Sequence, residues 1–180
     1  MKIQTNKIHT PVLLNEVIKG LNVKSSGTYV DCTAGFGGHS SQIAKVLTTG
    51  QLICIDQDIN AINHLKQLFK NNKNVSIVKT NFENIDQVIN KKVDGIMMDL
   101  GVSSLMFDQP QRGFSYKADG PLDMRMDNST KLTAKYILNN YTRAQLTNIF
   151  KQYGEVINPN KVVEQIVKQR ENKPLETTKE

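Results

Sequence analysis

Apolar residues in the first hundred positions alternate between short continuous runs and the wider spacing of amphipathic helices. The spacing predicts helices starting at Pro11 and near residues 39, 59 and 83, and Asp58 is a candidate cap for the third of them. The continuous runs predict four buried strands at residues 28–32, 51–56, 75–79 and 93–99. Strict alternation of helix and strand implies a parallel sheet with helices on both faces.

After residue 127 the pattern becomes helical throughout. The segment 128–130, which ends at Thr130, is the expected cap of a helix that runs to Asn140, and Thr142 and Asn158 are expected to start two more. We therefore expect a sheet-forming core over 1–104, a connecting loop over 105–130 and a helical domain over 131–180. Four strands are few for a parallel sheet of this class, so we expect an incomplete core and a truncated helical domain.

The stretch between Asp99 and Asp127 has neither helical nor strand periodicity. Irregular backbone of this length usually lines a functional site, and its many apolar side chains argue against disorder. It holds Arg112 and Arg125, two of the four arginines. Their planar guanidinium groups suit either a clamp for a carboxylate or phosphate, or an internal brace with nearby aspartates, and we favour the brace.

Composition indicates a protein of the cytoplasm. Among the 180 residues, 38% are hydrophobic, and no apolar run approaches the ~20 residues of a membrane helix. The net charge of +6 favours a polyanionic partner. Cys32 and Cys54 lie within strand-like runs, so we expect buried, reduced thiols, and no metal site because further ligands are missing.

A glycine-rich turn joins the first strand to a helix over residues 31–39. Its exposed N–H groups favour an anion or carboxylate, although a tight strand–helix connection alone would also need glycines. Ser40 stands where a dinucleotide fingerprint requires a third glycine, and no Gly-Lys-Ser/Thr of a P-loop follows. The turn therefore argues against NAD, FAD and nucleoside triphosphates.

Carboxylates end three of the predicted strands: Asp31, Asp56 and Asp99. Asp56 follows Gly35 by 21 positions, where a carboxylate can accept both hydroxyls of a ribose. Phe82 follows the third strand and can lie against an adenine ring or pack in the core. Together with the glycine turn, these residues fit an S-adenosylmethionine site best.

On these residues, the chain resembles the bacterial and organellar small-subunit (16S) ribosomal RNA cytosine-N4 methyltransferases. The block over residues 119–127 is the most specific part of the resemblance. The motifs that carry it are HTPVLL from His9, GGH ending at His39, IDQD from Ile55, DLGVSS from Asp99, RGFS from Arg112, DGPLDMRMD from Asp119, YGE from Tyr153, and Thr177-Thr178.

The resemblance implies a doubly wound, Rossmann-like methyltransferase core with a helical domain inserted after strand four. It implies transfer of a methyl group from S-adenosylmethionine to N4 of a cytidine, with small-subunit rRNA or the small ribosomal subunit as partner. Where the family favours glutamine, this chain has Met106. The implied cofactor contacts are Gly37, Gly38, His39, Asp56, Phe82, Asp99 and Met106.

Asp99, or the backbone at residues 100–101, is the candidate acceptor for the cytosine amine, and Asp99 could instead serve only the cofactor. Phe107, Phe114 and Tyr116 are candidates to receive the flipped base or to anchor the loop. Two alternatives remain: a catalytically silent fragment that binds S-adenosylmethionine or RNA, suggested by the short chain and Met106, and, disfavoured by Ser40, a nucleotide-dependent oxidoreductase.

Overall fold

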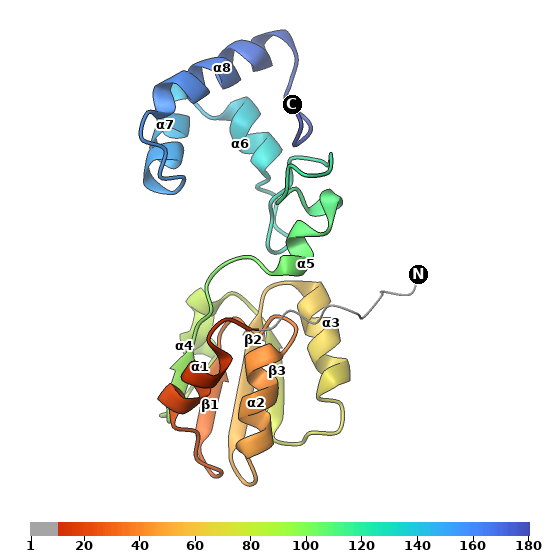
Figure 1. Ribbon diagram of the computed structural model, residues 1–180, viewed down its shortest axis with the longest axis vertical. Coiled ribbons are helices and arrows are strands. Elements are labelled where there is room, and N and C mark those ends of the chain that lie inside the picture. The colour runs from red at the N-terminus through yellow and green to blue at the C-terminus, as the bar shows by residue number, and fades with distance from the viewer. Residues whose placement is uncertain (1–10) are drawn as a thin grey trace. The chain divides into compact units, whose positions relative to one another are not determined.

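The computed structural model describes residues 11–180, apart from the side chain of Ser104. The chain forms two compact units, Met1–Gly101 and Val102–Glu180 (Figure 1). The motif position His9 and the predicted helix cap Thr10 lie outside the described residues.

The first unit is built on a four-stranded, all-parallel sheet in the order β3-β2-β1-β4. Central strand β1 pairs on one side with β2 and on the other with β4, so that Val30 lies opposite both Ile53 and Ile96. The predicted α/β class with a parallel sheet is confirmed, although the first and fourth strands end earlier than expected. The strands are β1 Thr28–Asp31, β2 Gln51–Asp56, β3 Val75–Lys79 and β4 Gly95–Met97.

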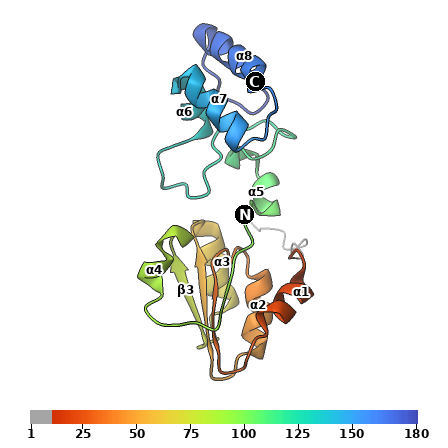
Figure 2. The ribbon, with the colours of Figure 1, turned by 90° about the vertical axis from the view of Figure 1, so that its left-hand side faces the viewer.

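Helices cover both faces of this sheet (Figure 2). On one face, α1 Leu14–Leu21, α2 Gly38–Val46 and α3 Ile59–Leu68 bury a cluster around Tyr29, Ile43 and Leu65. On the other face, η1 Phe82–Asn84 and α4 Ile85–Val88 pack against Val30, Cys32 and Ile55. Because β1 is buried on both sides, its carboxyl end has a fixed position beneath the glycine turn.

The start of α1 differs from the prediction. Pro11 was expected at the first helical position, but Leu13 adopts a left-handed conformation with φ 51° and the helix begins at Leu14. A proline start requires helical backbone directly after it, which the left-handed residue interrupts.

The second unit contains only helices and irregular segments. Thr142 caps α7 as predicted, and its side chain and that of Gln145 form a reciprocal capping box. Leu146 on α7 and Val163 on α8 are fully buried between these two helices. The helices are α5 Ser104–Phe107, η2 Pro110–Arg112, α6 Ala134–Asn140, α7 Arg143–Gln152 and α8 Pro159–Asn172.

The predicted cap of α6 is wrong. Thr133, and not Thr130, accepts the hydrogen bond from the N–H of Tyr136 at the helix start. Thr130 instead donates to the carbonyl of Asp127 at 2.9 Å and belongs to a turn. Across residues 11–180, every helix is too short or too polar to span a bilayer.

Candidate functional site

The carboxyl ends of four parallel strands meet at one edge of the first unit, where ligands of such sheets bind. At this edge the chain places the glycine turn after β1, Asp56 at the end of β2, Phe82 after β3 and Asp99 after β4. The structure thus brings together the site residues predicted for the first unit.

The glycines of the turn are required for different reasons. Gly35 and Gly37 have left-handed backbones, with φ 51° and 83°. A side-chain carbon on Gly37 would collide with Leu68 of α3, and one on Gly38 would collide with Pro11. On Gly35 it would meet nothing closer than the Thr33 carbonyl at 3.8 Å. Packing therefore crowds positions 37 and 38 and favours glycine at both, whereas Gly35 presents open backbone that a ligand can approach.

A series of buried hydrogen bonds supports the glycine turn. The hydroxyl of Ser40 donates to Asp31 at 2.6 Å, and the thiol of Cys54 donates to Ser40 at 3.3 Å. The backbone N–H of Thr33 donates to the other oxygen of Asp31. Burial raises the pKa of Asp31, and these donors partly oppose the shift. Ser40 thus has a structural task at the position where a dinucleotide fingerprint would have glycine.

Asp56 links the end of β2 to the glycine turn. Its Oδ2 accepts from the N–H of Gly35 and its Oδ1 from the N–H of Asp58, both at 2.8 Å. Burial raises the pKa of Asp56, while backbone donors at Asp58, Gly35 and Gln57 lower it. An ionised carboxylate offers about four lone-pair sites, more than these backbone donors occupy, so the group can also accept from a hydroxyl of a bound nucleoside. Asp58 caps α3 as predicted, accepting from the N–H of Asn60.

Phe82 packs against the cluster around Val30, Cys32 and Ile55, as the core-packing interpretation expects. It remains partly exposed. The preceding Asn81 caps η1 and donates to the side chain of Gln57, which holds this corner against the end of β2.

Asp99 has a fixed backbone and an open side chain. Its N–H donates to the hydroxyl of Thr33 at 2.7 Å, and its side chain is 49% exposed. The imidazole of His39 lies beside it, with 4.0 Å between Nδ1 and Oδ2. The other ring nitrogen of His39 lies 3.1 Å from the carbonyl of Val12; since a carbonyl only accepts, this Nε2 carries the proton. His39 is buried at the start of α2, where it contacts both the segment before α1 and the residue Asp99 after β4.

The two cysteines are buried and unpaired, as predicted. Burial raises the pKa of Cys32 to about 11 and that of Cys54 to about 12. Both thiols therefore stay protonated near neutral pH and are poor nucleophiles. Within residues 11–180, no three His, Cys, Asp or Glu side chains are placed to hold a metal ion.

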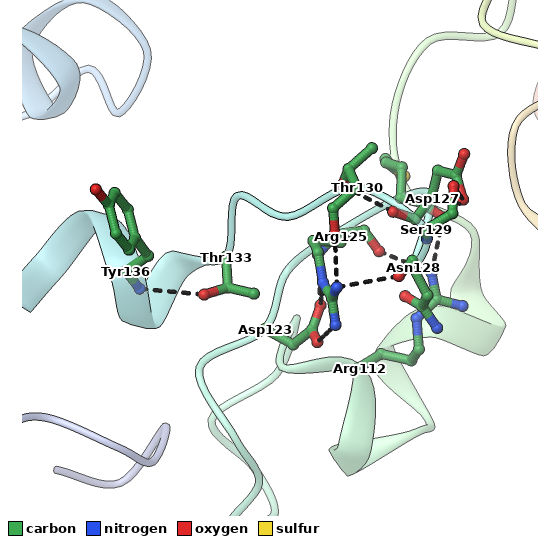
Figure 3. A network of polar contacts seen from close by, with 10 residues as sticks. Arg112, Asp123, Arg125, Asp127, Asn128, Ser129, Thr130, Thr133 and Tyr136 are labelled. Atoms are coloured by element: carbon green, nitrogen blue, oxygen red, sulfur yellow. Dashed lines mark hydrogen bonds and ion pairs between the residues drawn. The ribbon is translucent and has the colours of Figure 1, made fainter.

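Arg125 is the centre of a polar network in the second unit (Figure 3). Its guanidinium group binds Asp123 through two hydrogen bonds of 2.9 and 2.6 Å. Its third nitrogen donates to the carbonyls of Asn128 and Thr130. The charge of Arg125 lowers the pKa of Asp123 through these hydrogen bonds. The internal-brace interpretation is confirmed for Arg125.

Arg112 is buried and donates to the carbonyls of Arg125 and Met126 at 2.9 and 3.1 Å. It also lies 6.0 Å from the ring of Phe114. Among the proposed base receptors, Phe114 is thus engaged within the loop, while Phe107 and Tyr116 remain exposed. Met106 is buried within α5 of this unit.

The block over 119–127 is also held by the last residues of the chain. Thr177 forms an antiparallel bridge with Pro121. Thr178 donates its N–H to the carbonyl of Gly120 at 2.8 Å, and its hydroxyl oxygen accepts from the N–H of Gly120 at 3.2 Å. Hydrophobic periodicity does not predict this pairing, because it joins two irregular segments.

The functional residues missed by sequence reasoning are Thr33, which positions Asp99, and Ser40, which supports Asp31. The available signal was a hydroxyl in the turn at Thr33 and another in the first turn of α2 at Ser40. A separate hollow of about 540 Å³ is lined by residues 67–74, which precede β3 at the opposite edge of the sheet from Asp56 and Asp99.

A sequence profile described as the MraW methylase family matches residues 6–180. The chain is 52% identical over 177 residues to Ribosomal RNA small subunit methyltransferase H of Ureaplasma parvum serovar 3. It is 48% identical over 177 residues to the protein of the same name from Caldicellulosiruptor saccharolyticus. Each match covers 96% of this chain but only 58% of the relative, so the chain spans less than two thirds of their length.

Among solved structures, an rRNA methylase from Streptococcus thermophilus superposes with a TM-score of 0.42 and 16% identity. That superposition covers 50% of this chain and 54% of the other.

Proposed function

This chain belongs to the MraW methylase family, and from that premise we propose that it methylates N4 of a cytidine in 16S rRNA of the small ribosomal subunit. S-adenosylmethionine is the methyl donor in this proposal, and the cytoplasm is the place of action. The relatives that share about half of its residues are named as methyltransferases of small-subunit ribosomal RNA, which supports the substrate class.

The observation that carries the proposal is the set of polar groups at the carboxyl edge of the sheet. The open backbone at Gly35, the carboxylate of Asp56 and the carboxylate of Asp99 all lie at this edge. An amino-acid and nucleoside ligand offers an ammonium group, a carboxylate and two ribose hydroxyls, which are complementary to these groups.

The cofactor fits the residues present. In the proposal, Asp56 accepts the ribose hydroxyls through its remaining lone pairs, and the open side of the turn at Gly35 receives the amino-acid end. The predicted contacts of Gly37, Gly38, His39, Phe82 and Met106 stay predictions. Once bound, S-adenosylmethionine supplies an electrophilic methyl group on a sulfonium.

Asp99 is the candidate catalytic residue. A carboxylate that accepts hydrogen bonds from the exocyclic amine orients its lone pair and favours the positive charge that develops on nitrogen. The hydrogen bond from the Asp99 N–H to Thr33 holds the backbone of this residue at the edge of the sheet, and its half-exposed carboxylate is open to a substrate. The carbonyl groups at residues 100–101 offer a second acceptor.

Transfer of a labelled methyl group tests the activity. Small ribosomal subunits lacking the modification are incubated with tritiated S-adenosylmethionine and either this chain or the Ureaplasma parvum relative. We expect label in N4-methylcytidine after digestion of the rRNA to nucleosides. Label in another nucleoside would overturn the N4 assignment. Label with the relative alone would make this chain a silent fragment, and calorimetric binding of NAD without S-adenosylmethionine would overturn the methyltransferase proposal.

The role of Asp99 is tested with Asp99→Asn, which keeps the size of the side chain. If the carboxylate acts on the cytosine amine, kcat falls while the Kd for S-adenosylmethionine stays unchanged. If it serves only the cofactor, Kd rises and kcat at saturation is retained. Asp94→Asn is the matched control, because Asp94 lies before β4, where it accepts from the N–H of Thr28 at the opposite edge.

A further inference from the structure

A trough in the second unit lies between α6 and the segment that follows α8. Asn139 holds its two walls together: its amide nitrogen donates to the carbonyl of Leu175, and its oxygen accepts from the N–H of Leu175, at 2.8 and 2.9 Å. The trough has a volume of about 310 Å³, at the lower end of the range of roughly 300–1,000 Å³ for small-ligand sites. Its lining includes Lys131, Lys135, Tyr136, Asn140 and Pro174.

An aromatic ring stands in this trough. Tyr136 is 52% exposed, although the ring of Tyr141 contacts it edge-on with centroids 6.4 Å apart. The ring is turned away from the Arg125 network, to which its helix is joined through Thr133 (Figure 3). A tyrosine that is held in place yet half exposed offers a surface on which a nucleic-acid base can stack.

The positive charge near this ring comes from lysines. Arg112 and Arg125 donate to carbonyls and carboxylates of the loop itself, so they serve its internal structure. Lys135 pairs with Glu176 at 2.7 Å. Lys131 is exposed, and within residues 11–180 no carboxylate forms an ion pair with it. Its ammonium group is the one that can take up a phosphate.

The trough also offers a group that can read a base. The amide nitrogen of Asn140 donates to the carbonyl of Tyr136 at 2.9 Å, which orients the side chain. Among the described residues, no donor is bound to its amide oxygen, which can therefore accept from an exocyclic amine. Residues 102–180 carry twelve basic and nine acidic side chains, a balance that favours an anionic partner.

We propose that this trough binds one nucleotide of single-stranded RNA, with its base stacked on Tyr136 and its phosphate at Lys131. The inference rests on the proposed rRNA substrate and names a contact of that substrate outside the methyl-transfer site. RNA fits better than an acidic peptide, because a peptide would use the lysines but leave the tyrosine ring without a flat partner. Double-stranded RNA fits worse, since its bases are stacked inside the helix.

Fluorescence anisotropy with a labelled single-stranded decaribonucleotide tests the proposal. The complete chain is compared with Tyr136→Ala, Tyr136→Phe and Lys131→Gln. The matched controls are Tyr153→Ala and Lys151→Gln, because Tyr153 is 82% exposed and both residues lie in the same unit without lining the trough. Far-ultraviolet circular dichroism of each variant reports on folding.

We expect Tyr136→Ala to weaken binding by roughly 5- to 100-fold, the range for loss of one stacked base, and Tyr136→Phe to bind like the parent. Lys131→Gln should reduce the slope of log K against log salt by about 0.7, as for loss of one single-strand phosphate contact. Both controls should bind like the parent, and a duplex of the same sequence should bind more weakly.

Equal losses of RNA affinity in Tyr136→Ala and Tyr153→Ala, or no loss in either, would overturn the proposed binding of a nucleotide in the trough. RNA binding elsewhere on the chain and the proposed methylation would remain intact. Displacement of the RNA by polyglutamate with no effect of Tyr136→Ala would show a purely electrostatic surface and would also overturn it. Absence of RNA binding by the parent chain at low salt would overturn both the trough and the proposed RNA substrate. If Tyr136→Ala is unfolded, the proposal is tested by Lys131→Gln: an unchanged slope of log K against log salt in this variant would overturn it.

Discussion

Replacing Gly37 by alanine should destabilise the first unit more than the same change at Gly35. Both residues have left-handed backbones, which cost an alanine roughly 1–2 kcal/mol. At Gly37 the new methyl group also collides with Leu68 and lies near Leu65, and overpacking of this kind costs about 1–3 kcal/mol. At Gly35 nothing lies closer than the Thr33 carbonyl.

Urea denaturation followed by circular dichroism measures the difference. Alanine restricts the unfolded chain equally at both sites, so that contribution cancels between the two variants. We expect the free energy of unfolding to fall by about 1–2 kcal/mol for Gly35→Ala and by about 2–5 kcal/mol for Gly37→Ala. Equal losses would refute the conclusion that packing on α3 selects glycine at position 37.

The same pair separates folding from cofactor binding. If S-adenosylmethionine approaches the open backbone at Gly35, the methyl group of Gly35→Ala occupies part of its space. Calorimetry should then show an affinity lower by about tenfold or more, equivalent to roughly 1.4 kcal/mol, in a protein that remains folded. Unchanged affinity in Gly35→Ala would mean that the cofactor does not lie over this residue.

Three further outcomes are expected. Ser40→Ala removes a buried donor from Asp31 and should lower the free energy of unfolding by about 1.5–3 kcal/mol in urea denaturation, and a loss below 0.5 kcal/mol would contradict that role. Cys54 should not react with a thiol reagent at pH 8 in the folded protein, because its pKa is raised to about 12, and rapid labelling before unfolding would contradict its burial. Arg125 lowers the pKa of Asp123, so their pair should stabilise the protein above the usual carboxylate pKa of 3.8 and lose that contribution as the pH falls through the lower folded value. Asp123→Asn should lack this part of the acid transition followed by circular dichroism, and identical transitions would exclude the pair as its source.

Local rules predicted the parts of this protein that local interactions determine. The second and third strands have their expected bounds, because β-branched residues flanked by turn residues leave little alternative. Thr142 and Asp58 cap their helices as expected, since an N-cap hydrogen bond spans only two or three residues.

The wrong prediction for the start of α6 arose because side chains outside the helix determine where it begins. Thr130 looked like a helix cap, but Asp127 accepts from both the N–H and the hydroxyl of Ser129 and draws Thr130 into the same turn. Arg125 then binds the Thr130 carbonyl, and the helix begins at Ala134. The competition between a cap and a turn depends on Arg125, which helix-capping rules do not consider.

The sequence allowed the location of the candidate site residues to be predicted, but not the side-chain contacts that hold them. Strand-end positions brought Asp56 and Asp99 to one edge, because parallel strands share their direction. The contacts from Thr33 to Asp99 and from Ser40 to Asp31 depend on how the turn folds back over β1, which spacing in the sequence does not encode. The roles of these residues toward cofactor and RNA remain predictions.

The pairing of Gly120 with Thr178 has a consequence for the order of folding. The two residues are separated by almost sixty positions, so the chain must close a long loop before their hydrogen bonds can form. During synthesis, the block over 119–127 lacks these contacts until the segment around Thr178 has left the ribosome. We therefore expect the contacts of the block over 119–127 to form after the local contacts within the helices, because contacts between distant positions slow folding.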